Sequence, residues 1–392
     1  MPYERRKSRP VWVGNVQIGG DAPIVVQSMT TADTRDPKAT LRQIHELADA
    51  GCEIVRVAVP DKVAAAALSD IVPHSPIPVV ADIHFEHTLA LRALEAGVHK
   101  LRLNPGNIRK PEDVREVVQK AKERHVPIRI GVNFGSLPPM TREFVDEMAA
   151  QGATQTELIA EHMVRTALGH IRILEDLDFG DIVVSLKAFE VPVMLEAYRR
   201  MAKIRDYPLH LGVTEAGTPK SGAIRSAVGI GTLLAEGIGD TIRVSLTTDP
   251  VEEVIVAYEI LKSLGLRQRG ATLVACPTCG RVEVDLFKLA NEIDAYLKTI
   301  REPIKVAVMG CVVNGPGEAR DSDVGVAAGR GKGVIFRKGK IVRRVEEDEI
   351  VTALKEEIQL VLAERANGQS HDNSPQAERR MISIPVVEAK SP

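Results

Sequence analysis

Strand-like and helix-like segments alternate regularly through residues 23–247 of this 392-residue chain. Such alternation predicts βαβ units, in which parallel strands are joined by helices. Eight strand-like runs within about 250 residues match the repeat number and the length of a closed (β/α)8 barrel, a TIM barrel. The runs are Pro23–Met29, Glu53–Val59, Pro78–Ile83, Lys100–Pro105, Pro127–Asn133, Asp181–Lys187, Leu209–Glu215 and Thr241–Thr247.

The predicted strands alternate between apolar and polar side chains. In the eighth run, Ile242 and Val244 would share one face of the strand, and Arg243 and Ser245 would share the other. A doubly wound sheet buries both of its faces, so its strands are continuously apolar. The alternation therefore favours a closed barrel whose polar strand faces line the lumen and whose apolar faces pack against the helices.

The barrel prediction divides the chain into three parts. Residues 1–265 are expected to form the barrel, with the hairpin-like segment Val11–Ile18 as a plug at its bottom. Residues 266–365 read as a small α/β domain that carries three of the four cysteines. Residues 366–392 are rich in Asn, Gln, Ser, Pro and charge, which predicts a disordered tail.

Composition excludes several classes of function. A net charge of −2 and an aromatic content of 3% argue against a nucleic-acid partner. The basic start has no apolar run behind it and no stretch of about 18 apolar residues follows, so we expect neither a secretory signal nor a membrane helix. Four cysteines do not make a disulfide framework, and the expected compartment is the reducing cytoplasm.

Three cysteines and a glutamate form a constellation with metal-ligand spacing. Cys276 and Cys279 are separated by two residues, and Cys311 is followed by Glu318 within a glycine-rich loop. This pattern favours an iron–sulfur cluster, because thiolates are its preferred ligands. Three thiolates leave one iron of a four-iron cluster without sulfur, and a carboxylate such as that of Glu318 is a hard, exchangeable ligand for it.

Other interpretations of the cysteines remain open. Zinc would need a fourth sulfur or a histidine, and no histidine lies between His210 and His371. A thioredoxin-like dithiol would leave Cys311 without a role, and three inert cysteines are a further alternative. Cys52 precedes the second predicted strand at the bottom of the barrel, where we expect a structural residue.

Cationic residues lie in or at the ends of the predicted barrel strands. Two unit charges about 8 Å apart at an effective dielectric of about 20 repel by roughly 2 kcal/mol. Such a set predicts a bound anion, and a diphosphate suits the planar guanidinium groups, although structural ion pairs are the alternative for any single residue. The cations are Arg56, Arg102, Arg129, Lys187 and Arg243, with Asn104, Asn133 and Ser245 as neutral donors on the same faces.

Carboxylates near the strand ends are candidates for acid–base chemistry. Glu215 lies in a loop that leaves the seventh predicted strand, where the catalytic residues of barrels are found. It is therefore the predicted general acid/base. Asp82 and His84 are expected to support the site or the structure.

These motifs together resemble those of the bacterial 4-hydroxy-3-methylbut-2-enyl diphosphate synthase family, over residues 5–365. The resemblance implies a TIM barrel followed by an iron–sulfur domain like that of sulfite and nitrite reductases. It also implies reductive ring opening of 2-C-methyl-D-erythritol 2,4-cyclodiphosphate with two electrons, in isoprenoid biosynthesis. The matching motifs are Cys276–Gly280, Asn314–Glu318, Leu209–Gly217, Gly239–Ser245, Asn104–Asn107 and Val26–Met29.

The resemblance also implies a cofactor, partners and site residues. The cofactor would be a [4Fe–4S] cluster, the electron donor flavodoxin or ferredoxin, and the assembly a head-to-tail homodimer. A non-redox phosphate-binding barrel with a structural zinc domain, or an iron–sulfur sensor, are the alternatives from other classes. By motif, the ligands of the cluster would be Cys276, Cys279, Cys311 and Glu318. Glu215 would transfer a proton, and Asn314 would lie near both substrate and cluster. The diphosphate would be bound by Arg56, Arg102, Arg129, Asn133, Lys187, Arg243 and Ser245.

Overall fold

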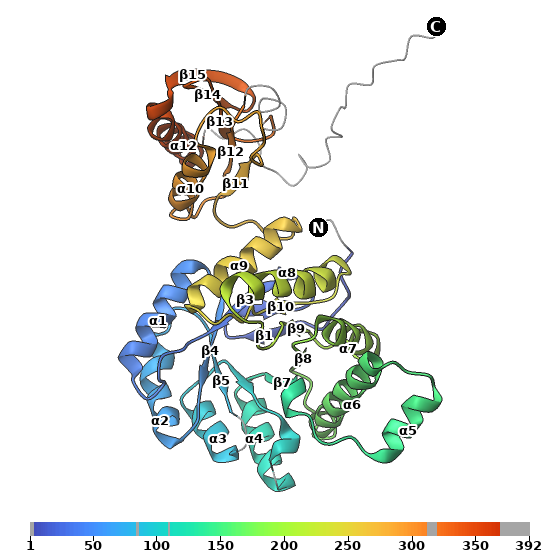
Figure 1. Cartoon of the computed structure of the whole chain (residues 1–392). Coiled ribbons are helices and arrows are strands. Elements are labelled where there is room, and N and C mark those ends of the chain that lie inside the picture. Colours follow the sequence, from blue (N-terminus) through green and yellow to red (C-terminus); the bar gives the residue numbers. More distant parts are fainter. Residues whose placement is uncertain (1–3, 84–85, 109, 312–319, 369–392) are drawn as a thin grey trace. The chain divides into compact units, whose positions relative to one another are not determined.

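The computed structural model describes residues 4–83, 86–108, 110–311 and 320–368 (Figure 1). The chain forms two compact units, which divide between Gln268 and Arg269. Within the described ranges, no helix has the length and apolar character needed to cross a membrane.

The first unit is built on eight parallel strands in the order β8-β7-β6-β5-β4-β3-β10-β9. An isolated parallel bridge between Val184 and Leu209 joins the two ends of this order, so the sheet closes on itself. The predicted TIM barrel is confirmed. Its strands are β3 (Val25–Met29), β4 (Ile54–Ala58), β5 (Val79–Asp82), β6 (Lys100–Arg102), β7 (Ile128–Asn133), β8 (Ile182–Lys187), β9 (His210–Leu211) and β10 (Thr241–Ile242).

Helices surround the barrel and bury the apolar strand faces (Figure 1). Local sequence signals set their ends: the Asp36 carboxylate accepts hydrogen bonds from the first turn of α1, and Gly51 ends that helix at a φ of 108°. The helices are α1 (Pro37–Ala50), α2 (Lys62–Ile71), α3 (His87–Glu95), α4 (Pro111–Glu123), α5 (Arg142–Ala150), α6 (Gln155–Glu175), α7 (Val191–Ile204), α8 (Pro219–Ala235) and α9 (Pro250–Ser263), with short 3-10 turns η1 (Val72–His74), η2 (Pro105–Asn107) and η3 (Phe134–Ser136).

A hairpin closes the bottom of the barrel. Strands β1 (Val11–Val13) and β2 (Val16–Ile18) pair antiparallel around a turn. Side chains of this hairpin, among them Ile18, pack with Val25 and Val80 from the barrel strands in one buried cluster. The predicted plug is confirmed.

The last two barrel strands are shorter than the sequence pattern suggested, since β9 and β10 end at Leu211 and Ile242. After β9, Glu215 adopts a left-handed φ of 54°, which a strand cannot contain. After β10, the backbone N–H of Leu246 donates to the Glu253 carboxylate over 3.0 Å instead of to a neighbouring strand. Both segments run in the predicted direction but leave the hydrogen-bonded ladder early.

The second unit is a five-stranded mixed sheet in the order β11-β12-β13-β14-β15. Helices α10 (Leu286–Leu297) and α12 (Ile350–Ala366) pack with the sheet in one buried apolar cluster. The tail prediction falls mainly on residues 369–392, which lie outside the described residues. The strands are β11 (Thr272–Ala275), β12 (Lys305–Met309), β13 (Val324–Gly329), β14 (Lys332–Arg337) and β15 (Lys340–Glu346), and the 3-10 turn η4 (Glu347–Glu349) precedes α12.

Candidate functional site

The inward faces of the barrel strands carry most of the predicted anion-binding side chains. Arg56 extends from β4, Arg102 from β6, Arg129 from β7 and Lys187 from the end of β8. The exposed fractions of Arg102, Arg129 and Lys187 are 5%, 1% and 6%. Arg243 follows β10 and is partly buried. The structure therefore gathers all five predicted cations in and around one lumen.

Asp82 orients two of these cations. Its carboxylate lies 3.4 Å from the Arg56 Nε and 3.3 Å from the Arg102 Nη1, and the residue is 7% exposed. A buried carboxylate that bridges two guanidinium groups fixes their positions as well as balancing part of their charge. Asp82, the last residue of β5, thus holds Arg56 and Arg102 in position.

Asn104 and Gly131 hold the neighbouring strands together at the same level. The Asn104 side chain donates to the Gly131 carbonyl over 2.9 Å and accepts from the Gly131 N–H over 2.8 Å. Arg102 donates to the same carbonyl over 3.0 Å. A Cβ at position 131 would lie 2.7 Å from the Arg102 Nε, so only glycine leaves room for that guanidinium.

Glu253 on α9 is a site residue that sequence reasoning missed. Its carboxylate accepts from the Arg243 Nε over 3.1 Å and Nη2 over 3.0 Å, and from the Ser28 hydroxyl over 2.9 Å. It is 3% exposed, whereas the adjacent Glu252 is exposed. The Arg243 Nη1 also donates to the Ser245 hydroxyl over 3.1 Å. Glu253 therefore holds the Arg243 guanidinium in place and, through it, the Ser245 hydroxyl.

We expect Glu253→Gln to lower the free energy of unfolding of the barrel unit by about 2 kcal/mol, because it leaves the Arg243 charge largely buried without its carboxylate. Urea unfolding followed by fluorescence of Trp12, the one tryptophan of the chain, measures this change. The matched control is Glu252→Gln, which alters an exposed carboxylate and should change stability by less than about 0.5 kcal/mol. Equal effects of the two substitutions on stability would contradict the role of Glu253 as the buried partner of Arg243.

The lumen cations perturb one another. Burial lowers the pKa of the Lys187 ammonium well below its ordinary value, and the Arg129 and Arg243 charges lower it further. Burial and the neighbouring Arg56 and Arg102 charges lower the pKa of Arg129 in the same direction. Burial lowers the pKa of Arg56 to about 10 despite the nearby Asp82. Burial is the largest cause of each shift, and the neighbouring cations add to it.

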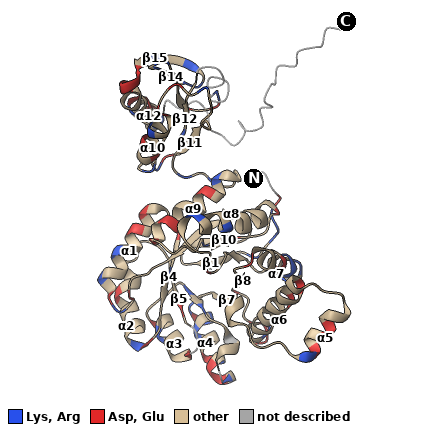
Figure 2. Ribbon diagram, viewed as in Figure 1, with Lys and Arg blue, Asp and Glu red and all other residues tan. Residues whose placement is uncertain are grey.

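The outer surface of the barrel unit carries charges of both signs, whereas the lumen carries mainly positive ones. Figure 2 shows Lys and Arg interspersed with Asp and Glu on the helices of the barrel unit. Many of these surface charges pair with each other, as Arg165 does with Glu147 at 2.6 Å. The excess of one sign is therefore a property of the lumen, where a bound anion would experience it in a low-dielectric environment.

The remaining predicted barrel residues lie around the cations. Asn133 is the register partner of Lys187 on the adjacent strand and is half-buried. Glu215 is exposed in the loop between β9 and α8, and no ion pair joins it to another described residue. His84 lies outside the described residues.

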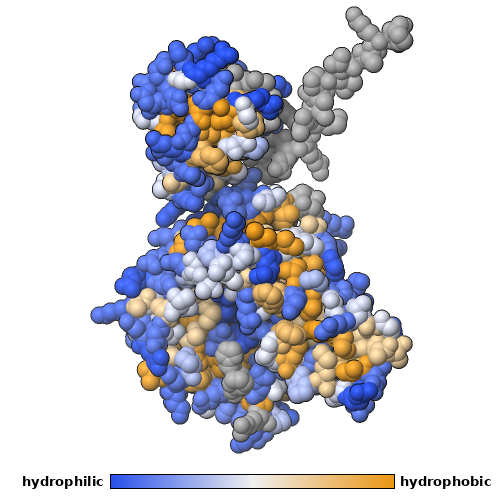
Figure 3. All heavy atoms as spheres, in the orientation of Figure 1, coloured by the Kyte–Doolittle hydropathy of each residue, from blue (hydrophilic) through white to orange (hydrophobic). Residues whose placement is uncertain are grey.

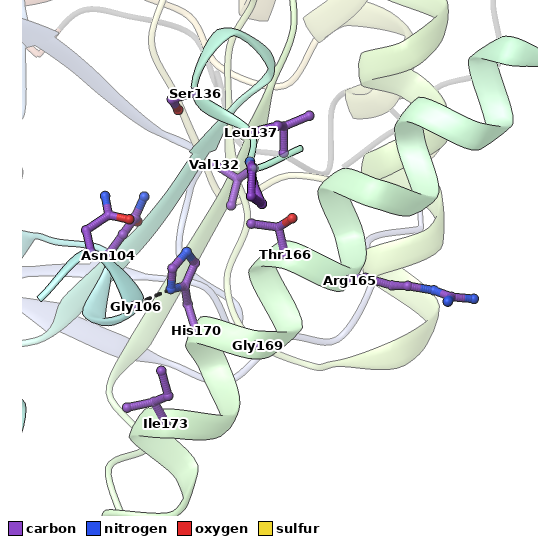
Figure 4. Close-up of a pocket in the computed structure, with 12 residues that line it drawn as sticks. Asn104, Gly106, Val132, Ser136, Leu137, Arg165, Thr166, Gly169, His170 and Ile173 are labelled. Carbon is purple, nitrogen blue, oxygen red and sulfur yellow. Dashed lines mark hydrogen bonds between the residues drawn. The ribbon is translucent and has the colours of Figure 1, made fainter. Parts of the chain in front are cut away.

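A pocket of 460 Å³ opens beside Asn104, between η2, η3 and α6 (Figure 4). The Gly106 N–H donates to the His170 Nδ1 over 2.9 Å, which ties the η2 loop to α6. Burial lowers the pKa of His170 and so favours the neutral ring that can accept this bond. Sequence reasoning did not anticipate this pocket, because His170 lies on a helix with no distinguishing pattern around it.

In the second unit, two cysteines follow adjacent parallel strands. Cys276 comes directly after β11 and Cys311 lies two residues beyond the end of β12, which pairs with β11 in parallel. The Gly310 N–H donates to the Cys276 sulfur over 3.2 Å. Cys276 and Cys311 are partly buried and Cys279 is exposed.

The described residues do not show the complete set of predicted cluster ligands. Glu318 and Asn314 lie in residues 312–319, outside the described residues. Within the described part of the chain, no group of three or more His, Cys, Asp or Glu side chains is arranged to hold a metal ion. Cys52 is buried in the barrel, where its thiol donates to the Ile54 carbonyl over 3.1 Å and burial raises its pKa to about 12. An inert, structural thiol accounts for Cys52.

Comparison with known families matches both units. The family described as the GcpE TIM-barrel domain matches residues 8–258, and that described as the GcpE protein C-terminal domain matches residues 272–360. The first match contains the cationic lumen and the second contains Cys276, Cys279 and Cys311.

Curated relatives cover nearly the whole chain. A Bacillus cytotoxicus protein is 54% identical over 372 residues, which is 95% of this chain and 98% of the relative. A Dehalococcoides mccartyi protein is 58% identical over 354 residues, 90% of this chain and 98% of the relative. A Geobacillus thermodenitrificans protein is 57% identical, over 90% of this chain and 92% of the relative. Each is named 4-hydroxy-3-methylbut-2-en-1-yl diphosphate synthase (flavodoxin).

Proposed function

Since this chain belongs to the GcpE family, we propose that it is the oxidoreductase that makes 4-hydroxy-3-methylbut-2-en-1-yl diphosphate for isoprenoid biosynthesis. The proposed substrate is 2-C-methyl-D-erythritol 2,4-cyclodiphosphate. Its ring is opened and a hydroxyl is removed with two electrons. The product keeps the diphosphate, so one anion-binding site can hold both molecules.

The cationic lumen is the observation that carries this proposal. Within the described part of the barrel, its cations are accompanied on the lumen side by the carboxylates of Asp82 and Glu253. A diphosphate supplies the missing negative charge and accepts bidentate bonds from guanidinium groups. The cations are Arg56, Lys100, Arg102, Arg129, Lys187 and Arg243.

We assign the diphosphate to the upper, strand-end part of this lumen. Arg243 and Ser245 are already held together, at 3.1 Å, and Asn133 pairs in register with Lys187. Neutral donors among fixed cations orient a phosphate without adding repulsion. The proposed set is Arg56, Arg102, Arg129, Asn133, Lys187, Arg243 and Ser245, with Asn314 from outside the described residues.

Glu215 is the proposed proton-transfer residue. It lies in the loop that leaves β9, at the carboxyl end of the barrel strands where barrel enzymes place their catalytic groups. Its left-handed backbone, with φ at 54°, turns the chain sharply at this residue. A carboxyl in this loop can donate or accept a proton at the substrate as its hydroxyl leaves.

The donor set of the second unit fits an iron–sulfur cluster. Three thiols lie in or near loops that follow adjacent strand ends, and the Gly310 N–H bonded to Cys276 would stabilise a thiolate there. We propose that Cys276, Cys279 and Cys311 hold a [4Fe–4S] cluster, with Glu318 as the fourth ligand. When bound, such a cluster supplies single electrons at a potential that nearby N–H donors tune.

We propose flavodoxin as the electron donor, with ferredoxin as the alternative, and the cytoplasm as the compartment. The names of the relatives include flavodoxin. We further propose a head-to-tail homodimer. Exposed apolar side chains on the barrel unit support a protein contact: Ile224 and Val228, one turn apart on α8, are 59% and 54% exposed. Figure 3 shows apolar patches among hydrophilic residues on the visible face.

We expect diphosphate binding to take up protons. The pKa of Lys187 is depressed in the free lumen by burial and neighbouring cations, and a bound anion favours the ammonium form and raises that pKa. Because the free state holds fewer protons, affinity falls as pH rises through the depressed pKa. Calorimetry in buffers of different ionisation enthalpy measures the uptake. Lys187→Met should reduce the proton uptake. The control Lys38→Met, at an exposed position of α1, should leave the uptake unchanged. A binding heat that is the same in all buffers would contradict the prediction.

We expect Gly131→Ala to raise KM about tenfold, which corresponds to about 1.4 kcal/mol of binding free energy. The new Cβ would displace the Arg102 guanidinium, whose Nε lies 2.7 Å from its position. Gly135→Ala is the matched control, because its Cβ would meet nothing within 4 Å. Steady-state kinetics separate the two, and unchanged KM in Gly131→Ala would show that Arg102 does not bind the substrate.

The proposed function is tested by anaerobic reconstitution with iron and sulfide. The reconstituted protein is given the cyclodiphosphate and reduced flavodoxin, and the alkenyl diphosphate is measured by mass spectrometry. Broad visible absorbance of a cluster together with product formation supports the proposal. One tightly bound zinc with neither absorbance nor product would instead favour the non-redox phosphate-binding barrel.

A further inference from the structure

Helix α6 carries two histidines that hold loops at the carboxyl end of the barrel strands, and the proposed reaction uses neither. The His170 Nδ1 accepts a hydrogen bond over 2.9 Å from the N–H of Gly106, which lies in η2 after β6 (Figure 4). About two turns earlier on the helix, the His162 Nε2 donates to the Pro138 carbonyl over 2.7 Å, in the segment after η3. The helix is thus attached to the loops that follow both β6 and β7.

Helix α6 is the fixed side of these contacts. A capping box between Thr154 and Glu157 sets its first turn. Ala167 and Ile171, which flank His170 along the helix, are both 0% exposed and belong to the core of the barrel unit. A close-packed core resists displacement of such a helix. The position of the His170 ring is therefore set by the core, and the loop depends on the ring.

The fit between the His170 ring and η2 is close. A Cβ at position 106 would lie 2.5 Å from the His170 Cε1 and 2.6 Å from its Nδ1. Gly106 is not among the glycines with a positive φ, so an alanine could adopt its backbone conformation. It is the contact with the ring that requires glycine at this position.

The loop that His170 holds also contains Asn104, which joins two cation-bearing strands. The N–H of Asn107 donates to the Asn104 carbonyl over 2.9 Å, so η2 closes directly on Asn104. Strands β6 and β7 share two register pairs, the second of which joins Arg102 and Arg129. The Asn104 amide extends this short ladder through its two hydrogen bonds to the Gly131 backbone. Displacement of Asn104 would therefore change the spacing of the two guanidinium groups.

We propose that His170 is a positioning residue for diphosphate binding, which acts through η2 and Asn104 on Arg102 and Arg129. The ring itself does not touch the substrate. This inference rests on the proposed function, because it takes these two guanidinium groups to bind the diphosphate. A ring that only filled space would need no acceptor atom, so the acceptor at Nδ1 distinguishes a positioning role from a structural one.

The first experiment compares His170→Asn with His170→Leu in the full-length, reconstituted protein. The two new side chains have similar size and shape, but only asparagine keeps an acceptor oxygen near the position of Nδ1. We expect His170→Leu to weaken binding of the cyclodiphosphate about three- to tenfold, the net value of one hydrogen bond, and His170→Asn to weaken it less. Calorimetry before the reductant is added measures the dissociation constants.

Two further readouts separate positioning from structure. The value of kcat at saturating substrate should stay the same in both variants, because the lost contact supports binding of the substrate and the transition state alike. Thermal unfolding followed by circular dichroism measures stability. Equal affinities of His170→Leu and His170→Asn, or a lower Tm in His170→Leu with the affinity of the parent protein, overturn the proposal.

A double-mutant cycle tests the same contact from the side of the loop. Gly106→Ala should weaken binding in the parent protein, because its Cβ would meet the ring, and should cost less in a His170→Ala background. Gly169→Ala, on α6 beside the same pocket, is the matched control, because its Cβ would meet nothing within 4 Å. Equal costs of Gly106→Ala in both backgrounds overturn the proposal. If the His170 variants do not fold, an equal effect of Gly106→Ala and Gly169→Ala on binding overturns it.

Failure of the proposed function gives a different result. A folded parent protein that does not bind the cyclodiphosphate would refute that function, and inorganic pyrophosphate would then replace it as the probe of the cations. An affinity for pyrophosphate that falls from the parent protein to His170→Asn to His170→Leu would still support the role of His170. Equal affinities for pyrophosphate, or none in the parent protein, would overturn it.

Discussion

Cys311→Ser is expected to reduce turnover below detection while the protein stays folded. Cys311 is partly buried after β12, and serine keeps its shape and a polar atom. A serine hydroxyl is a poor ligand for iron compared with a thiolate, so the proposed cluster would be lost or unstable. Iron and sulfide content, visible absorbance and product formation measure the effect, and far-UV circular dichroism measures the fold.

The matched control for Cys311→Ser is Cys52→Ala. Cys52 belongs to the barrel unit, where it is buried and bonds the Ile54 carbonyl, so its loss should leave cluster content unchanged. A structural zinc site makes the opposite prediction, because removal of a zinc ligand unfolds a small zinc domain. A Cys311→Ser protein with an unfolded second unit, from a zinc-containing parent, would contradict the iron–sulfur assignment.

Glu215→Gln is expected to lower kcat by about 10²–10⁴-fold, the usual contribution of a general acid or base. The amide keeps the size of the side chain but does not exchange a proton. KM should change little, because Glu215 is exposed and contributes no cation to the lumen. Single-turnover kinetics with a pre-reduced enzyme isolate this step from electron delivery.

Glu190→Gln is the control for Glu215→Gln. Glu190 is also exposed and lies in the loop that leaves the neighbouring strand β8, directly before α7. The two substitutions remove the same charge from the same end of the barrel, so they change the long-range field alike. Equal losses of kcat would show that Glu215 acts through charge alone and transfers no proton.

Much of the barrel site was predictable because strand alternation is a local property. Arg129 and Gly131 share a strand face by the two-residue period alone, and the eight-fold repeat then directs that face into the lumen. The plug was predictable for a similar reason, since a Gly-Asn turn between two short apolar runs specifies a hairpin. The cysteine spacing is likewise a local signal.

Glu253 shows what the sequence does not reveal. It stands next to Glu252 on α9, and both are acidic residues in the first turn of an amphipathic helix. The side chains differ only in direction: one is exposed, and the other reaches Arg243 and Ser28. That distinction depends on how α9 packs against β3 and the loop after β10, which no short pattern encodes.

Strand β13 was unanticipated because its sequence is rich in glycine and alanine, which are poor strand formers. Packing across the sheet explains the glycine, because a Cβ at position 325 would clash with the Phe336 ring. The partner strand β14 supplies that ring through the register pair Gly325–Phe336. The contact between Gly325 and Phe336, which are 11 positions apart, therefore outweighs the low strand propensity of glycine and alanine.

The plug has a consequence for traffic through the barrel. With Val13 and Ile18 buried against the lower strands, the described residues close the barrel at its bottom, so a ligand would enter and leave on the side where the strands end. Substrate and product share the diphosphate group, so they would compete for the same cations from that one side. A product that dissociates slowly would therefore block the next substrate from binding. Product release can then limit the turnover rate of the enzyme.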